Sequence, residues 1–367
     1  PDEGKVGGHQ ASSSSIVTIL TSLYFDFMCK EDLISIKPHA SPTFHAIQYL
    51  LGNLDDHYLK TLRAFHGLQS YPSRTKDPDR VDFSTGSVGI GSIAPNFAAL
   101  SESYLRSHGY MENSPKGRYI SLLGDAELDE GTVWETIAEP TMANLPNVLW
   151  IVDLNRQSVD RIIPGIRVGA WKEMFAANGW TVVEAKYGKL LHRVFDQPKG
   201  ELLRAAIDDM SNEMYQRLLR ISPDQLRKWL PRTSKFPKDL RRLIDQWDDN
   251  LLQKIIGNLG GHDFSTLREA FSKADESEGP AVVFAYTLKG WRLPSVGDPQ
   301  NHSVVLSRKQ MEQLKSELGI GNQKIWARFN PSSEIGNFIT NSAHFGRQIT
   351  PINQKTDLQS IDTSFGH

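Results

Sequence analysis

The sequence predicts an α/β fold with a mostly parallel central sheet and helices on both faces. Two apolar runs, Tyr119–Leu123 and Val148–Val152, have the length of buried strands, and each is followed by polar residues. A helical pattern lies between them, so we expect a parallel pair joined by a right-handed crossover. Trp180–Ala185 and Pro280–Tyr286 are two further strand candidates. Strands that alternate with helices are typical of α/β folds.

The segments before these strands follow the same alternation. Residues 12–30 carry apolar side chains at helical spacing, and residues 32–36 are predicted to form a short strand. Residues 43–65 are predicted to be helical. Residues 66–91 are rich in Gly, Pro and Ser and are predicted to be loops, and a helix is expected at residues 94–108.

The domain organisation predicted from these patterns is one large α/β domain over residues 1–317. Residues 200–258 are charged and helical in pattern, which favours a helical insertion on the flank of the sheet. Residues 318–367 are predicted to be a linker or an arm over a partner, because Asn, Ser, Thr, Gly and Pro dominate from residue 328 onward.

Composition excludes several classes of protein. The 41 basic and 43 acidic residues nearly balance, so no basic surface for nucleic acid or an anionic membrane is expected. Cys29 is the single cysteine, which excludes an intrachain disulfide and a multi-thiolate metal site. No apolar run approaches the length of about 20 residues that spans a membrane. We therefore expect a cytoplasmic protein.

The strongest indication of chemistry is an acid and an amide 30 positions apart, Asp125 and Asn155. Each follows one of the two predicted strands, and ligands of open parallel sheets lie beyond the carboxyl ends of the strands. Carboxylate and amide oxygens on neighbouring strands can share one Mg²⁺ together with phosphate oxygens. By themselves the two residues would equally suit a helix cap and a turn.

The motifs around this pair resemble those of one family. Gly-Asp-Gly followed by Asn about 30 residues later is the diphosphate motif of thiamine-diphosphate enzymes, and Gly124-Asp125-Ala126 with Asn155 is similar to it. The chain is identified as a member of the transketolase-like branch that contains the homodimeric pyruvate dehydrogenase decarboxylating component. The resemblance covers roughly residues 4–317, and it also rests on Gly8-His9-Gln10-Ala11-Ser12, Pro38-His39-Ala40-Ser41-Pro42, Ser70-Tyr71-Pro72, Ser84–Gly91, Gly260–Asp263 and Lys289-Gly290.

This resemblance implies thiamine diphosphate and Mg²⁺ as cofactors and assigns a role to each matched residue. Asp125, Asn155 and the backbone carbonyl of Gln157 would bind the metal. His9, His39 and His302 would act on the substrate. The expected cofactor contacts come from Ser12, Tyr71, Val88, Ala126, Glu127 and Lys289.

The sequence departs from the resemblance at three positions. Ala126 replaces the second glycine of the motif, and alanine tolerates a positive φ poorly. Asp153 replaces an asparagine near the diphosphate, and an ionised carboxylate cannot donate a hydrogen bond. The Asp153 carboxylate would therefore either ligate the metal or turn away from the diphosphate. Lys37 replaces a glutamine and places a cation where it could aid a phosphate or a substrate carboxylate.

The family's reaction is decarboxylation of a 2-oxo acid such as pyruvate, with carbon chemistry supplied by the cofactor. The glutamate that activates the cofactor lies in a second, pyrimidine-binding domain, and no counterpart is found here. We therefore expect a fragment or a separate subunit that pairs with such a domain. A homodimer and a dihydrolipoyl acyltransferase partner are implied as well.

Three alternatives remain open from the sequence. The first is a transketolase-type transfer of a two-carbon unit, which Asp129-Glu130-Gly131 favours slightly. The second is a degenerate, non-catalytic member of the fold, suggested by Ala126 and Asp153. The third is an unrelated Mg²⁺-dependent enzyme that handles phosphates through Asp125.

Overall fold

The computed structural model describes residues 9–86, 88–111, 113–158, 161–162, 167–320 and 325–342. For residues 9, 158, 161 and 162 it describes the backbone alone.

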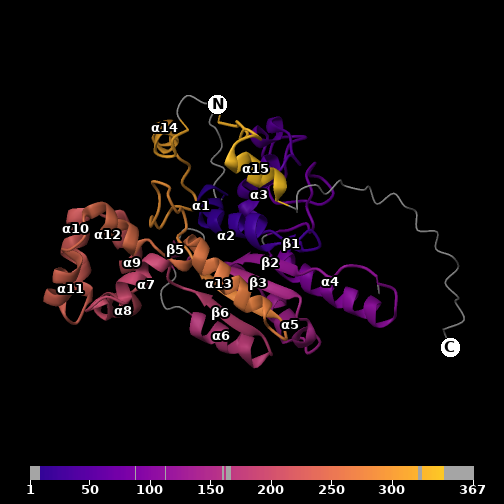
Figure 1. The fold of residues 1–367 in the computed structure, drawn as a ribbon, viewed down its shortest axis with the longest axis horizontal. Coiled ribbons are helices and arrows are strands. Elements are labelled where there is room, and N and C mark those ends of the chain that lie inside the picture. Colours follow the sequence, from indigo (N-terminus) through magenta and orange to yellow (C-terminus); the bar gives the residue numbers. More distant parts are fainter. Residues whose placement is uncertain are drawn as a thin grey trace, which may run out of the picture.

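A parallel sheet of five strands forms the centre of the molecule (Figure 1). The strands lie in the order β1-β2-β3-β7-β6, and each neighbouring pair is parallel. The predicted α/β fold is therefore confirmed, and each apolar run identified in the sequence forms a strand. The bounds are β1 Leu33–Ser35, β2 Tyr119–Gly124, β3 Val148–Leu154, β6 Thr181–Ala185 and β7 Ala281–Tyr286.

The strands are apolar throughout because both faces of the sheet are covered. Every residue of β3 and of β7 is buried. Successive side chains of a strand point to opposite faces. Leu149 and Ile151 accordingly belong to one core cluster, whereas Trp150 and Val152 belong to the other.

One face of the sheet packs against α4 Ile90–Ser107, α5 Gly131–Ala138 and α6 Val168–Ala177, through residues such as Ala99, Val133 and Phe175. The other face packs against α2 Val17–Ser22, α3 Ser41–Leu50 and α13 Phe264–Asp275, and α1 His9–Ser15 packs beside α3. A π-helix, Leu23–Phe27, extends α2. The prediction of helices on both faces is confirmed.

Two predicted helical segments have different bounds in the structure. The expectation of helix over residues 43–65 was wrong beyond Leu50, where α3 ends and Gly52 takes a φ of 84°. A 3-10 helix, Asp56–Lys60, and turns follow. The helix expected from residue 94 instead begins at Ile90, because Gly89 with a φ of 78° turns the chain into α4.

Helices fill the region that the charge pattern indicated. α7 Lys189–Phe195 leads into α8 Gly200–Asp209, α9 Asn212–Arg220, α10 Pro223–Trp229, α11 Pro237–Ile244 and α12 Asp249–Ile256. Ser211, Ser222 and Asp248 cap three of them by accepting backbone N–H bonds. This helical region lies at one end of the molecule (Figure 1).

The segment after β7 holds more structure than its composition indicates. It contains α14 Arg308–Glu317 and α15 Glu334–Asn341, whose first turn is capped by Ser333. The rings of Phe338 and Phe25 lie 6.3 Å apart, so α15 contacts the N-terminal helices. The prediction of a linker or arm over residues 318–367 otherwise falls partly outside the described residues. In the described parts of the chain, no helix combines the length and apolarity needed to cross a bilayer.

Candidate functional site

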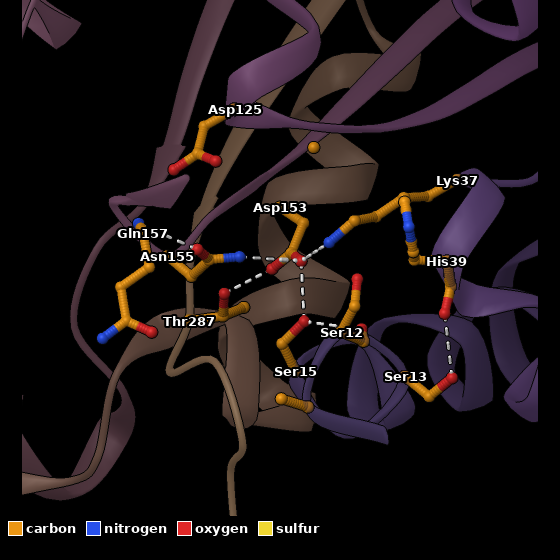
Figure 2. Close-up of polar contacts among 12 residues, drawn as sticks. Ser12, Ser13, Ser15, Lys37, His39, Asp125, Asp153, Asn155, Gln157 and Thr287 are labelled. Atoms are coloured by element: carbon orange, nitrogen blue, oxygen red, sulfur yellow. Dashed lines mark hydrogen bonds and ion pairs between the residues drawn. The ribbon is translucent and has the colours of Figure 1, made fainter. Parts of the chain in front are cut away.

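Polar side chains converge where β2, β3 and β7 end. The register pairs Gly124 of β2 with Asp153 of β3, and Leu154 of β3 with Tyr286 of β7. The residues that follow these strands are therefore neighbours at one edge of the sheet. Figure 2 shows Asp125, Asp153, Asn155 and Thr287 gathered at this edge.

The three residues predicted to bind a metal meet here and are buried. Asp125 is 7% exposed, and Asn155 and Gln157 are each 3% exposed. The Arg156 N–H donates to Asp125 Oδ2 at 2.6 Å, and the Gln157 N–H donates to Asn155 Oδ1 at 3.0 Å. Arg156 makes this possible with a φ of 59°, in the left-handed region.

The electrostatics of this edge suit a hard cation. Burial, together with Asp153, raises the pKa of Asp125 to about 6. Burial also raises the pKa of Glu127 to about 7. The buried Asn155 amide oxygen and the backbone carbonyl of Gln157 follow the neighbouring strand β3. Buried carboxylate and amide oxygens of this kind are the ligands that Mg²⁺ prefers, so the residues present fit the metal.

Asp153 does not turn toward Asp125, and it is fully buried among donors. Its carboxylate lies 2.6 Å from Lys37 Nζ and accepts a hydrogen bond from Ser15 Oγ at 2.7 Å. Asn155 Nδ2 at 3.2 Å and the Thr287 hydroxyl donate to it as well (Figure 2). Burial alone would raise the pKa of Asp153, but the Lys37 ammonium and the hydroxyl groups outweigh it and hold the pKa below its usual value.

The loop expected to hold a diphosphate is a 3-10 helix, Asp125–Asp129. Glu127 closes it, because its carboxylate accepts from the Gly124 N–H at 2.7 Å and from Ser92 Oγ at 3.2 Å. Ala126 is exposed and is not among the residues with positive φ. Alanine is therefore unstrained at this position, and the difficulty expected from losing the glycine does not arise.

An aromatic cluster brings together three predicted residues from distant parts of the chain. The His39 ring lies 5.3 Å from the Tyr71 ring and 5.4 Å from the His302 ring, measured between centroids. Ser13 Oγ donates to the His39 carbonyl at 3.1 Å. In the preceding helix α1, Ser12 is 4% exposed. The side chain of His9 lies outside the described residues.

The two remaining predicted contacts differ in exposure. Lys289, which follows β7, is 4% exposed and is therefore not a solvated lysine at a strand end. Its charge lowers the pKa of Asp125, which places Lys289 near the residues predicted to bind a metal. Val88 is 54% exposed in the turn before Gly89.

His262 has a structural role beside the end of β7. It belongs to a short 3-10 helix, Gly260–His262, and Asp263 caps the following helix α13. His262 Nε2 accepts the Leu288 N–H at 2.8 Å, and its ring stacks on Trp291. Burial lowers the pKa of His262 to about 3, so the ring is neutral.

Sequence reasoning missed Ser15, Thr287 and the link between Lys37 and Asp153. Thr287 directly follows β7, but the sequence does not reveal that β7 pairs with β3. Ser15 lies three residues after Ser12, the last residue of a matched motif. That spacing on a helix was the signal that could have placed it at the same site.

Comparisons with known proteins agree on the kind of domain. Residues 26–197 match the family described as "Transketolase, thiamine diphosphate binding domain". The chain is 26% identical over 323 residues to the pyruvate dehydrogenase E1 component of Escherichia coli, an alignment that covers 85% of this chain and 36% of that protein. The E1 component of Cupriavidus necator is 27% identical over 312 residues, which cover 81% of this chain and 34% of that protein. The chain thus spans about a third of the length of these relatives.

Solved structures of transketolases share the fold. The transketolase from Leishmania mexicana superposes with a TM-score of 0.61 at 17% identity, covering 94% of this chain and 41% of that one. The transketolase from Campylobacter jejuni gives a TM-score of 0.58 at 16% identity, covering 92% and 46%.

Proposed function

We propose a specific role for the chain from the match of residues 26–197 to the family of transketolase thiamine diphosphate binding domains. It is the diphosphate-binding and Mg²⁺-binding half of a 2-oxo acid dehydrogenase decarboxylating component, with pyruvate as the first candidate substrate. The E1 components that are 26–27% identical over most of the chain support this choice.

The observation that carries the proposal is the meeting of Asp125, Asn155 and Gln157 at the ends of two adjacent parallel strands. The Asp125 carboxylate, the Asn155 amide oxygen and the Gln157 carbonyl would hold Mg²⁺. A cation there would offset the burial that raises the pKa of Asp125. It would also favour the ionised form of this carboxyl group.

The remaining residues would position the organic parts of the complex. Ser12, Lys289 and the loop of Ala126 and Glu127 would hold the diphosphate, and Tyr71 and Val88 would line the rings of the cofactor. His9, His39 and His302 would face the substrate, where a histidine can take up or release a proton near neutral pH. When bound, thiamine diphosphate supplies the electron sink that decarboxylation of a 2-oxo acid requires.

The proposed assembly includes a pyrimidine-binding domain, on the same or another chain, that provides the activating glutamate. We propose a homodimer of such units and a dihydrolipoyl acyltransferase as acceptor of the acyl group. A functional site is supported because both departures from the family pattern are accommodated. Ala126 has no backbone strain, and Asp153 is paired with Lys37.

Binding experiments test this proposal directly. Titration calorimetry with thiamine diphosphate should show Mg²⁺-dependent binding, and Asp125→Asn should weaken it at least about tenfold, the equivalent of about 1.4 kcal/mol. Asp129→Asn is the matched control, because Asp129 is an exposed acid in the same 3-10 helix. Binding that is indifferent to both Mg²⁺ and Asp125→Asn would contradict the proposal.

A transketolase-type activity is the second candidate, and the family match and the shared fold favour it. Mixing the chain with a pyrimidine-binding domain would separate the two activities. Carbon dioxide release from pyruvate supports the first candidate, whereas two-carbon transfer between sugar phosphates supports the second.

A further inference from the structure

A buried ammonium group stands beside the loop that begins at the end of β2. Lys37 is 8% exposed, and its Nζ lies 2.6 Å from Asp153 Oδ2. A Cβ atom built on Gly124 would lie 3.6 Å from the same Nζ. The ammonium group therefore reaches the backbone at which β2 ends and the 3-10 helix Asp125–Asp129 starts.

This ammonium group has more donors than hydrogen bonds, and the Asp125 and Glu127 carboxylates are near enough for its charge to lower their pKa values. A lysine carries three N–H donors. Within the part of the chain that the structure describes, Lys37 Nζ makes one hydrogen bond, to Asp153. Buried polar groups are costly unless they are hydrogen-bonded. Two of its donors are therefore available to an anionic ligand that approaches the end of β2.

Asp153 fixes this ammonium group but cannot itself bind an anion. Ser15, Thr287 and Asn155 all donate to its carboxylate, which holds it in one orientation. An ionised carboxylate only accepts hydrogen bonds. The donor that an asparagine at position 153 would offer to a phosphate is thus missing, and Lys37 provides donors at the same edge of the sheet.

We infer that Lys37 binds a phosphate oxygen of the ligand and that Asp153 is the positioning residue that holds it there. This inference rests on the proposed function, because it takes the ligand to be a diphosphate. The two departures of the sequence from the family pattern, at positions 37 and 153, then act as one unit. Each is suited to the site only in the presence of the other.

Inorganic pyrophosphate with Mg²⁺ is the probe, titrated by calorimetry into the full chain and its variants. Lys37→Gln leaves a buried carboxylate without its ion pair next to the anion. We expect at least about thirtyfold weaker binding, the effect of about 2 kcal/mol. Adding Asp153→Asn removes the repulsion and restores a donor, so the double variant should bind at least about tenfold more tightly than Lys37→Gln. Lys37→Arg, which keeps the charge, should also bind more tightly than Lys37→Gln.

The matched control is the exposed pair of Lys199 and Asp239, which has the same 2.6 Å separation. Lys199→Gln with Asp239→Asn should leave pyrophosphate binding unchanged. If Lys37→Gln fails to fold, the same contact is measured by comparing Asp153→Asn with the double variant that also carries Lys37→Gln. The single variant, which keeps Lys37, should bind pyrophosphate more tightly. Equal affinities in that pair would overturn the inference.

Other outcomes separate this inference from the proposed function. A folded Lys37→Gln variant with the affinity of the unmodified chain overturns the inference alone, as does a double variant no better than Lys37→Gln. If Lys37→Gln weakens the binding of pyruvate but not that of pyrophosphate, Lys37 contacts a substrate carboxylate, and the inference is overturned. If the unmodified chain binds pyrophosphate through Lys37 but does not bind thiamine diphosphate, the proposed function fails and the phosphate contact stands.

Discussion

Asp153 shows how a single residue can be tolerated where its charge is unfavourable. Its side chain is fully buried, and removing a charge from water costs several kcal/mol. The ion pair with Lys37 and the hydrogen bonds from Ser15, Thr287 and Asn155 offset this cost. Removing one partner of such a pair is strongly destabilising, by about 3–5 kcal/mol, because the other charge stays buried.

His262 allows a prediction at the same scale. Burial lowers its pKa from 6.5 to about 3, with Asp153 raising it and Arg292 lowering it further. The unfolded chain therefore takes up a proton that the folded chain does not, so this contribution to stability is present above pH 6.5 and is lost as the pH falls toward 3.

We expect the unmodified chain to lose about 2 kcal/mol through this group between about pH 7 and pH 5. His262→Gln should remove that part of the pH dependence, since its amide oxygen can still accept the Leu288 N–H. Urea unfolding at several pH values measures the effect. An unchanged pH slope in the variant would contradict this account.

At the scale of elements, the end of β3 and the turn after it build most of the site. Asp153 is within the strand, and Asn155 and Gln157 follow it. With Arg156 in the left-handed conformation, its own N–H donates to Asp125 and the Gln157 N–H donates to Asn155. Such a conformation costs of order 1–3 kcal/mol at a residue other than glycine, and it is often found at functional sites.

Asp263 connects two helices and gives the second prediction. Its carboxylate accepts from the Thr266 N–H at the start of α13 and from the Lys189 N–H at the start of α7, each at 3.0 Å. Asp248 caps α12 alone, through the Leu251 N–H at 2.7 Å. Asp263→Ala should therefore cost about 2 kcal/mol and Asp248→Ala about 1 kcal/mol of unfolding free energy. Denaturant titrations compare them, and equal losses would show that the contact with α7 adds nothing.

At the scale of the whole molecule, the sheet separates two core clusters and its edge carries the site. Close backbone approaches keep that edge compact. A Cβ on Gly261 would lie 2.5 Å from Thr287 Cγ2 and 2.7 Å from the Tyr286 carbonyl oxygen. The glycine thus allows the 3-10 helix Gly260–His262 to pack against the end of β7, where Thr287 bonds to Asp153.

Gly261→Ala should force these segments apart and lower the unfolding free energy by about 1–3 kcal/mol. Gly169 of α6 is the control, because a Cβ there would meet nothing within 4 Å. Gly169→Ala should cause no loss of stability. Thermal unfolding of both variants checks this expectation, and a harmless Gly261→Ala would show that the neighbouring backbone can shift freely.

Much of this architecture could be predicted from particular residues. Apolar runs such as Val148–Val152 identified the strands, and Asp125 and Asn155 identified the edge of the sheet that carries the site. Segment bounds were less predictable, because Gly52 and Gly89 end or begin helices through conformations that composition does not reveal. The meeting of His39, Tyr71 and His302 agrees with the expectation of one site, although their roles remain a prediction.

By itself, the sequence determined the α/β class, the position of each strand and the place of the Asp125 and Asn155 pair at the ends of two strands, because these depend on local patterns and on chain order. Only the tertiary structure decided that β7 lies beside β3 and that Lys37 pairs with Asp153 across 116 positions. Strand order and buried ion pairs depend on how whole faces pack together. When a strand is apolar on both faces, its own sequence does not indicate which strand lies beside it in the sheet.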